Sequence, residues 1–315
     1  MSIVAPEFQH MVKQEVSVEA LSEMLTRLYL LYCVKRKKFE KVIQKIQPKV
    51  ILEVVSYNLD CMIFNEIAYE KKINTIELQH GVMSGSIAYY YPKNVLIKQF
   101  PQKVFLFSDY WKNCISVPLE DKNVISVGYP YFEEQVKKYQ KINRDKNKTT
   151  KVILFLSQWT IGENFSKFAV EFSNLINDKW KIIYKLHPGE YSNWKKRYPW
   201  LANSGIEVVD SLRHNIYEYF AISNVQVGVS STAIFEGLGF GLDTFIFNTV
   251  SAECMKQLCQ DGFAAEVNSA KELADKLEKN IKSKKNKDKL FWKENAFNNL
   301  CVEINKCIDS TTACS

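Results

Sequence analysis

The chain has 315 residues, 46% hydrophobic and 24% charged, with a formal net charge of +7. This length exceeds what one compact core usually holds, so we expect two globular domains and no disordered chain. No apolar run reaches the ~18 residues of a membrane-spanning helix, and the first residues lack the pattern of a signal peptide. Eight cysteines occur singly, without a CxxC pair, which favours reduced thiols and a cytoplasmic location. The charge comes without a nucleic-acid-binding signature, so we expect no nucleic acid partner.

The first half of the chain predicts a short α/β domain, residues 1–140. A helical pattern runs from about Val18 to Lys45, interrupted at the basic segment 35–38, and Pro48 separates it from the first strand. Short apolar runs then predict strands at 50–55, 74–78, 103–107 and 124–127, with helices at 62–71 and 109–116. Short β-branched runs with helices between them are typical of buried parallel strands.

The alternation restarts after a polar, lysine-rich segment, 141–150, which we interpret as a linker. Residues 151–315 then predict a second α/β domain that ends in helices. Its strands are expected at 151–156, 181–185, 206–209, 225–229 and 244–247, and its helices at 163–177, 191–201, 214–221, 232–239, 252–260 and from about 269. Strict succession of strand and helix predicts two Rossmann-type parallel sheets facing a cleft, the first one short.

Hydroxyl groups follow the strand at 225–229. Ser230, Ser231 and Thr232 stand where this strand gives way to a helix, so their hydroxyls and the first helical amides can converge on an anion. A simple helix cap is the alternative. Glu236 does not have the spacing of a capping box with any of the three, which leaves its carboxylate free to accept from ribose hydroxyls.

A second polar group follows the strand at 181–185. Pro188 ends this strand and keeps His187 extended, while Lys185 lies one alternation earlier on the same face. Both side chains can bind a phosphate, although a histidine satisfied by the backbone is the alternative. Ser157 and Gln158 open the first loop of this domain, a usual wall of a nucleotide pocket.

The first domain contributes the segment from Glu77 to Gly81. His80 follows the second predicted strand, and Gly81 lets the backbone turn sharply. A neutral imidazole there can take a proton from an attacking hydroxyl near neutral pH. The long loop beyond carries Tyr89 and Tyr90, which suit either a sugar platform or turn packing. No spacing typical of a metal site occurs, so we expect no metal.

With these motifs in place, the chain resembles bacterial GT-B-fold glycosyltransferases of capsule, O-antigen and lipooligosaccharide (lipopolysaccharide) biosynthesis, in particular sialyltransferase-like and polysialyltransferase-like enzymes. The resemblance covers about 50–277 and rests on the His187-Pro188 pair, the Ser230-Ser231 pair and the element from Glu77 to Gly81. Those families tend to carry two acids before the glycine, where this chain has Gln79 and His80.

The resemblance implies an inverting, metal-independent glycosyltransferase without a cofactor. Its co-substrate would be a nucleotide sugar, best a CMP-activated sialic-acid-like sugar, and its acceptor a glycan or lipid-linked glycan. The second domain would bind the donor, and the first would be the acceptor side, with His80 or Glu77 as the base and Gln79, Tyr89 and Tyr90 near the acceptor. Because such acceptors are often lipid-linked, peripheral contact with an anionic inner-membrane face also follows from the resemblance.

Four other functions fit the same pattern. One is a CDP-polyol phosphotransferase: these enzymes resemble the chain as a whole more distantly, but a histidine before the glycine is closer to their pattern. A sugar-nucleotide epimerase or hydrolase would use the same fold but needs more acids in the cleft. A nucleotide-sugar-binding subunit without catalysis, or a basic membrane-surface scaffold that uses the lysines of 271–293, stands outside enzyme chemistry.

Overall fold

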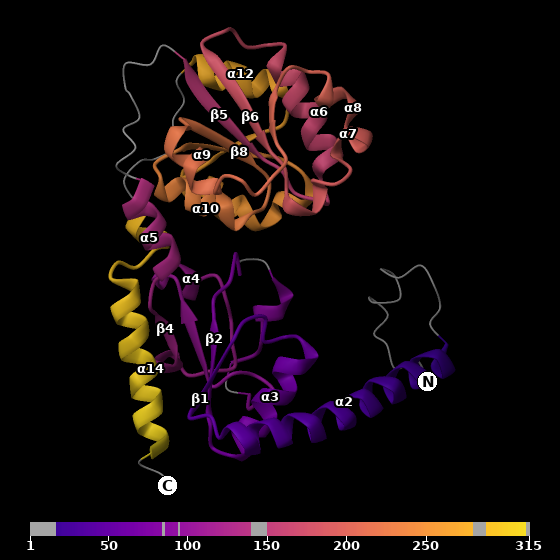
Figure 1. Ribbon diagram of the computed structural model, residues 1–315, viewed down its shortest axis with the longest axis vertical. Coiled ribbons are helices and arrows are strands. Elements are labelled where there is room, and N and C mark those ends of the chain that lie inside the picture. Colours follow the sequence, from indigo (N-terminus) through magenta and orange to yellow (C-terminus); the bar gives the residue numbers. More distant parts are fainter. Residues whose placement is uncertain (1–16, 84–85, 94, 140–149, 280–287, 313–315) are drawn as a thin grey trace. The chain divides into compact units, whose positions relative to one another are not determined.

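The computed structural model describes residues 17–83, 86–93, 95–139, 150–279 and 288–312 (Figure 1). Nearly all of the predicted linker, 141–150, lies outside the described residues. By internal contacts the chain forms two units, one of Met1–Leu78, Asn94–Val104 and Ile304–Ser315 and the other of Gln79–Lys93 and Phe105–Glu303. Within the described ranges, no helix combines the length and the apolar character that crossing a membrane requires.

The first sheet has four strands in the order β1-β2-β3-β4, and their bounds are Val50–Glu53, Asn74–Leu78, Lys103–Leu106 and Val124–Ser126. β1 and β2 run parallel, in a register that sets Glu53 opposite Glu77. Between them lies α3 (Leu59–Glu70), and the later helices of this half are α4 (Asp109–Lys112) and α5 (Pro130–Tyr139), with 3₁₀ turns at Ile87–Tyr89 and Asp121–Asn123.

The first helix, α2 (Val18–Ile46), is continuous, so the predicted interruption at the basic segment 35–38 is wrong. Acids of α3 hold two of these basic residues: Lys35 pairs with Asp60, and Arg36 pairs with Glu70 at 2.5 Å. On the same side, Ile43 is buried in a cluster with Ile63. Packing of one face of α2 on α3 therefore outweighs the mutual repulsion of the basic residues.

The second sheet has six parallel strands in the order β10-β9-β8-β5-β6-β7. Their bounds are β5 Lys151–Leu156, β6 Trp180–Lys185, β7 Glu207–Val209, β8 Val225–Gly228, β9 Asp243–Phe247 and β10 Ala265–Val267. The chain first builds outward from β5 through β6 and β7 and then returns to add β8 on the other side of β5. This reversal is a topological switch point, where open α/β sheets bind ligands at the carboxyl ends of the strands.

The helices of the second half are α6 Gly162–Ser173, α7 Trp194–Arg197, α8 Pro199–Ala202, α9 Ile216–Ile222, α10 Thr232–Gly239, α11 Lys256–Gln260, α12 Ala270–Glu278, α13 Asp288–Phe291 and α14 Ala296–Thr312, with 3₁₀ turns at Pro188–Glu190 and Val250–Met255. The single helix predicted at 191–201 is two short helices, because Pro199 starts a new one.

The last part of the chain returns to the first half. Trp111 Nε1 donates to the carbonyl of Phe291 at 3.0 Å, and the amide of Ala296 donates to Glu133 at 2.7 Å. α13 and the start of α14 therefore pack against α4 and α5, which the order of the sequence does not suggest.

Candidate functional site

The predicted phosphate-binding residues meet at the switch point between β5 and β8. Gln158 follows β5 and Ser230 follows β8, and the two are joined twice. The Gln158 side-chain amide donates to the Ser230 carbonyl at 2.7 Å and accepts from the Ser230 amide at 2.9 Å. Gln158 thus fixes the backbone that leads into α10, so its first effect is to position the hydroxyls that follow.

Ser231 is the N-cap of α10, and its hydroxyl accepts from the amide of Ala233 at 3.3 Å. The positive end of the helix macrodipole lies at this point. The capping role considered as the alternative is therefore present, and it leaves the Ser231 hydroxyl proton available to a ligand.

A capping box shapes the loop after β6. The His187 amide donates to the Glu190 carboxylate at 2.8 Å, and His187 Nδ1 accepts from the amide of Gly189 at 3.1 Å. Because Nδ1 accepts, the neutral ring carries its proton on Nε2, which makes Nε2 a donor. The local turn chemistry thus fixes the tautomer of an exposed histidine at the edge of the sheet.

Glu190 itself is buried and accepts a second hydrogen bond, from the Tyr198 hydroxyl at 2.7 Å. Gly162, the first residue of α6, leaves room for this pair. A Cβ on Gly162 would lie 2.2 Å from both Glu190 Oε1 and the Tyr198 hydroxyl. No pattern in the sequence predicts this support, because it depends on three segments that only the fold brings together.

Lys185 is buried beneath the same loop. Its ammonium donates to the Leu186 carbonyl at 3.2 Å and to the Tyr191 hydroxyl. Burial lowers the pKa of Lys185, and the nearby charge of Asp210 opposes that shift. Beside it, the Ser157 hydroxyl accepts from Tyr184 at 3.1 Å.

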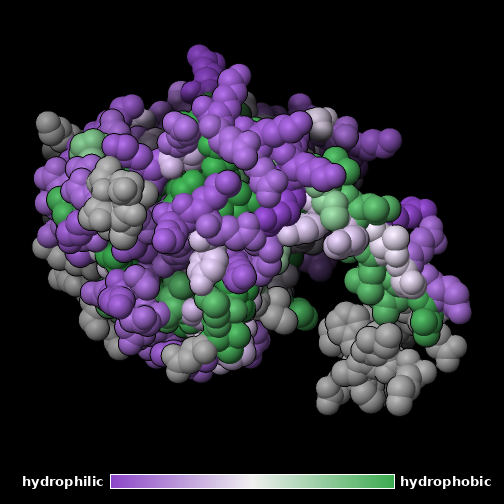
Figure 2. All heavy atoms as spheres, turned by 90° about the horizontal axis from the view of Figure 1, so that it is seen from below, coloured by the Kyte–Doolittle hydropathy of each residue, from purple (hydrophilic) through white to green (hydrophobic). Residues whose placement is uncertain are grey.

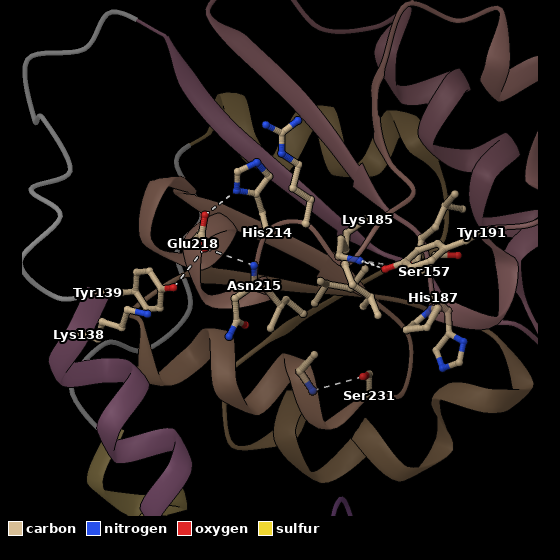
Figure 3. Close-up of a pocket in the computed structure, with 17 residues that line it drawn as sticks. Lys138, Tyr139, Ser157, Lys185, His187, Tyr191, His214, Asn215, Glu218 and Ser231 are labelled. Atoms are coloured by element: carbon tan, nitrogen blue, oxygen red, sulfur yellow. Dashed lines mark hydrogen bonds and ion pairs between the residues drawn. The ribbon is translucent and has the colours of Figure 1, made fainter.

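A cavity of about 620 Å³ lies over these residues (Figure 3). Five of the predicted donor-binding residues line it, namely Ser157, Lys185, His187, Pro188 and Ser231. Gln158, Ser230, Thr232 and Glu236 are not among its lining residues.

The far wall of the cavity comes from the end of α5, from the loop that leads into α9 and from the first turn of α9. It carries Lys138, Tyr139, Arg213, His214 and Glu218. Burial alone would raise the pKa of Glu218, yet hydrogen bonds, first from His214 at 2.9 Å, bring it below the ordinary value. Glu218 is the one acid among the described residues that line the cavity, so this wall carries a net positive charge. No sequence signal marked this wall.

Two of the predicted donor-binding residues that do not line the cavity, Glu236 and Thr232, make contacts elsewhere. Glu236 is buried in α10; burial raises its pKa to about 7, against the opposing effect of a hydrogen bond with Tyr217. Thr232 accepts from the amide of Val82 at 3.1 Å.

This last bond brings the predicted base segment to α10. It joins the backbone two residues after His80 to the first residue of the helix. A Cβ on Gly81 would come within 3.0 Å of the Thr232 hydroxyl, so glycine permits the close approach. His80 is exposed at this position.

The other residues predicted for the first domain have different surroundings. Glu77 is fully buried and accepts from both the Ser56 hydroxyl, at 2.7 Å, and the Ser56 amide, at 3.2 Å. Gln79 is also buried and accepts from the Phe107 amide at 2.8 Å. Tyr89 is buried and Tyr90 is exposed. Of the two candidate bases, His80 is thus exposed to solvent and Glu77 is not.

No family model matches the chain, and a search of curated proteins finds no match either. Its fold is similar to that of Methanocaldococcus jannaschii UDP-GlcNAc 2-epimerase in complex with UDP-GlcNAc and UDP, with 16% identity, a TM-score of 0.57, and 87% of this chain and 80% of that chain covered. Neisseria meningitidis UDP-GlcNAc 2-epimerase bound to UDP-GlcNAc has 13% identity and a TM-score of 0.58, with 90% of this chain and 82% of that chain covered. Acinetobacter baumannii MurG has 7% identity and a TM-score of 0.53, with 78% of this chain and 68% of that chain covered.

At these identities the likeness concerns the fold. The chain has two parallel-sheet α/β domains of the GT-B type, as predicted.

Proposed function

We propose that the protein is a nucleotide-sugar-dependent enzyme and that it binds the nucleotide phosphate at the switch point of the second sheet. The observation that carries the proposal is the cavity that His187, Lys185 and Ser231 line together. They offer an imidazole donor, a cation and a hydroxyl at the start of α10. That combination favours an anion, because the helix dipole and the donors act on the same charge.

Glycosyl transfer is the reaction that we propose first. The acceptor hydroxyl attacks the anomeric carbon and gives its proton to His80, while the bond from that carbon to the phosphate oxygen breaks. The nucleotide leaves with the bonding electrons, and His187, Ser231 and the α10 dipole stabilise its phosphate. The link between Val82 and Thr232 supports this role for His80, because it tethers the base segment to the phosphate-binding helix.

Epimerisation of a nucleotide sugar is the second candidate. It is favoured by the neighbours in fold, several of which are UDP-GlcNAc 2-epimerases, with TM-scores up to 0.59. Both reactions use the same phosphate site. They differ in whether a second substrate is needed.

For the nucleotide, the same neighbours favour UDP as the first choice and leave CMP, which the sequence resemblance favoured, as the alternative. A glycan or lipid-linked acceptor and independence from metal remain parts of the proposal.

The test incubates the full chain with UDP-GlcNAc and follows the products by proton NMR. An epimer at carbon 2 without an acceptor supports the second candidate, whereas release of UDP only when a glycan acceptor is added supports transfer. A matched pair of variants assigns the roles. His80→Ala should abolish turnover and keep nucleotide affinity, whereas His187→Ala should weaken nucleotide binding about tenfold, the effect of one lost hydrogen bond to a charged group. If neither UDP nor CMP binds, the proposal is wrong.

A further inference from the structure

The helix α2 carries an unusual amount of exposed apolar surface (Figure 2). From Met24 to Val34, seven of the eleven residues are large exposed hydrophobics. Leu30 and Val34, for example, are 59% and 68% exposed. A concentration of this kind marks an interaction surface and not ordinary scattered exposure.

Three of these apolar residues and four lysines together form a stripe along one side of α2. Leu30, Leu31 and Val34 are followed by lysines at 37, 38, 41 and 45, and this spacing keeps all seven residues on one face. The face that packs on α3, with Arg36, Phe39 and Ile43, is the opposite one. The stripe is therefore not used by the contact between α2 and α3.

The charges of the stripe select the kind of partner. Lys37, Lys38, Lys41 and Lys45 are exposed, and none of them forms an ion pair with a described residue. Nearer the start of the helix, Glu23 is paired with Arg27 at 2.6 Å. An anionic surface would satisfy the lysines while the apolar side chains enter it.

We propose that α2 docks the protein on an anionic lipid bilayer, with Leu30, Leu31 and Val34 at the level of the headgroups and the four lysines against lipid phosphates. Apolar side chains next to lysines are the usual composition of helices that lie in a membrane interface. Each lysine near an anionic surface contributes roughly fivefold in affinity. This docking would bring the enzyme to membrane-bound substrates and is independent of the chemistry of its cavity.

The experiment is sedimentation of the full chain with phosphatidylcholine vesicles and with vesicles that also contain phosphatidylglycerol. We expect binding to the anionic vesicles only, and loss of binding as salt is raised from about 0.1 M to 1 M, where the screening length falls to roughly 3 Å. The double variant Lys37→Glu/Lys41→Glu should weaken binding more than about twentyfold. Leu30→Ser/Val34→Ser should also weaken it.

The matched control is Lys271→Glu/Lys279→Glu, which changes the same charge on exposed lysines of α12 and its cap. It should bind like the unaltered chain, and circular dichroism should show that every variant is folded. Equal loss in this control, or no difference between the two kinds of vesicle, would overturn the proposal. A dimer in solution that Leu30→Ser/Val34→Ser dissociates, without vesicle binding, would assign the surface to a second copy instead.

Discussion

Gly162→Ala is a small change that should disturb the proposed phosphate site through the contacts that support it. The added Cβ would lie 2.2 Å from Glu190 Oε1 and from the Tyr198 hydroxyl, and both side chains are about 1% exposed. Neither can move into solvent without breaking the 2.7 Å bond between them or the bond from Glu190 to the His187 amide. The alanine therefore has to displace the loop that carries His187.

The magnitude follows from two costs. Overpacking of a tight interior site costs about 1–3 kcal/mol. Loss of a hydrogen bond to a buried carboxylate costs about 1.5–3 kcal/mol more. We expect the free energy of unfolding to fall by about 3 kcal/mol, because partial relaxation makes the two costs less than additive. The affinity for UDP should fall about tenfold as His187 moves.

Urea denaturation and calorimetric titration with UDP measure the two effects. Gly205→Ala is the matched control, since a Cβ there meets no atom within 4 Å although its φ of +77° disfavours alanine. It should cost about 1 kcal/mol from the backbone alone and leave UDP binding unchanged. If Gly162→Ala is as stable as the unaltered chain and binds UDP equally well, the support by Glu190 does not exist as described.

Three further predictions concern the helix caps, the buried carboxyl of Glu236 and the need for a metal. Ser231→Ala and Ser269→Ala each remove a helix cap and should each cost about 1 kcal/mol in urea denaturation, but only Ser231→Ala should weaken UDP binding in calorimetry. Glu236 has a pKa of about 7 against an ordinary 4.5, so its carboxyl stabilises the fold below about pH 4.5 and that contribution is lost as the pH rises through 7. Glu236→Gln should therefore raise the free energy of unfolding at pH 8 by up to about 3 kcal/mol and change it little at pH 4, and equal effects at both would contradict the burial of this carboxyl. Turnover should persist in EDTA, whereas loss that Mg²⁺ restores would refute metal independence.

Most of the sheet could be predicted from the sequence, because buried parallel strands are short apolar runs whose ends are marked by polar or turn residues. The boundary between β8 and α10 is an example, with Val225, Val227 and Val229 apolar and Ser231 capping the helix. β10, by contrast, has only three residues, and Glu266 lies in its middle. Its strand character comes from pairing with β9, which no local pattern reveals.

The candidate site was partly predictable for the same reason. Parallel strands bring their carboxyl ends to one edge, so Ser157, Lys185, His187 and Ser231 were expected to meet. The interactions of Glu190 with Tyr198 and of Gln158 with Ser230 were not expected, because they join residues from separate loops. Such contacts depend on the packed fold and leave no periodicity in the sequence.

Calorimetric titration of the full chain with UDP, repeated with His187→Ala and with the control Ser269→Ala, tests the proposed nucleotide site most directly. We expect saturable binding of one nucleotide that His187→Ala weakens at least about tenfold and that Ser269→Ala leaves unchanged. If neither UDP nor CMP binds, or if His187→Ala binds as tightly as the unaltered chain, the cavity at the switch point is not the nucleotide site.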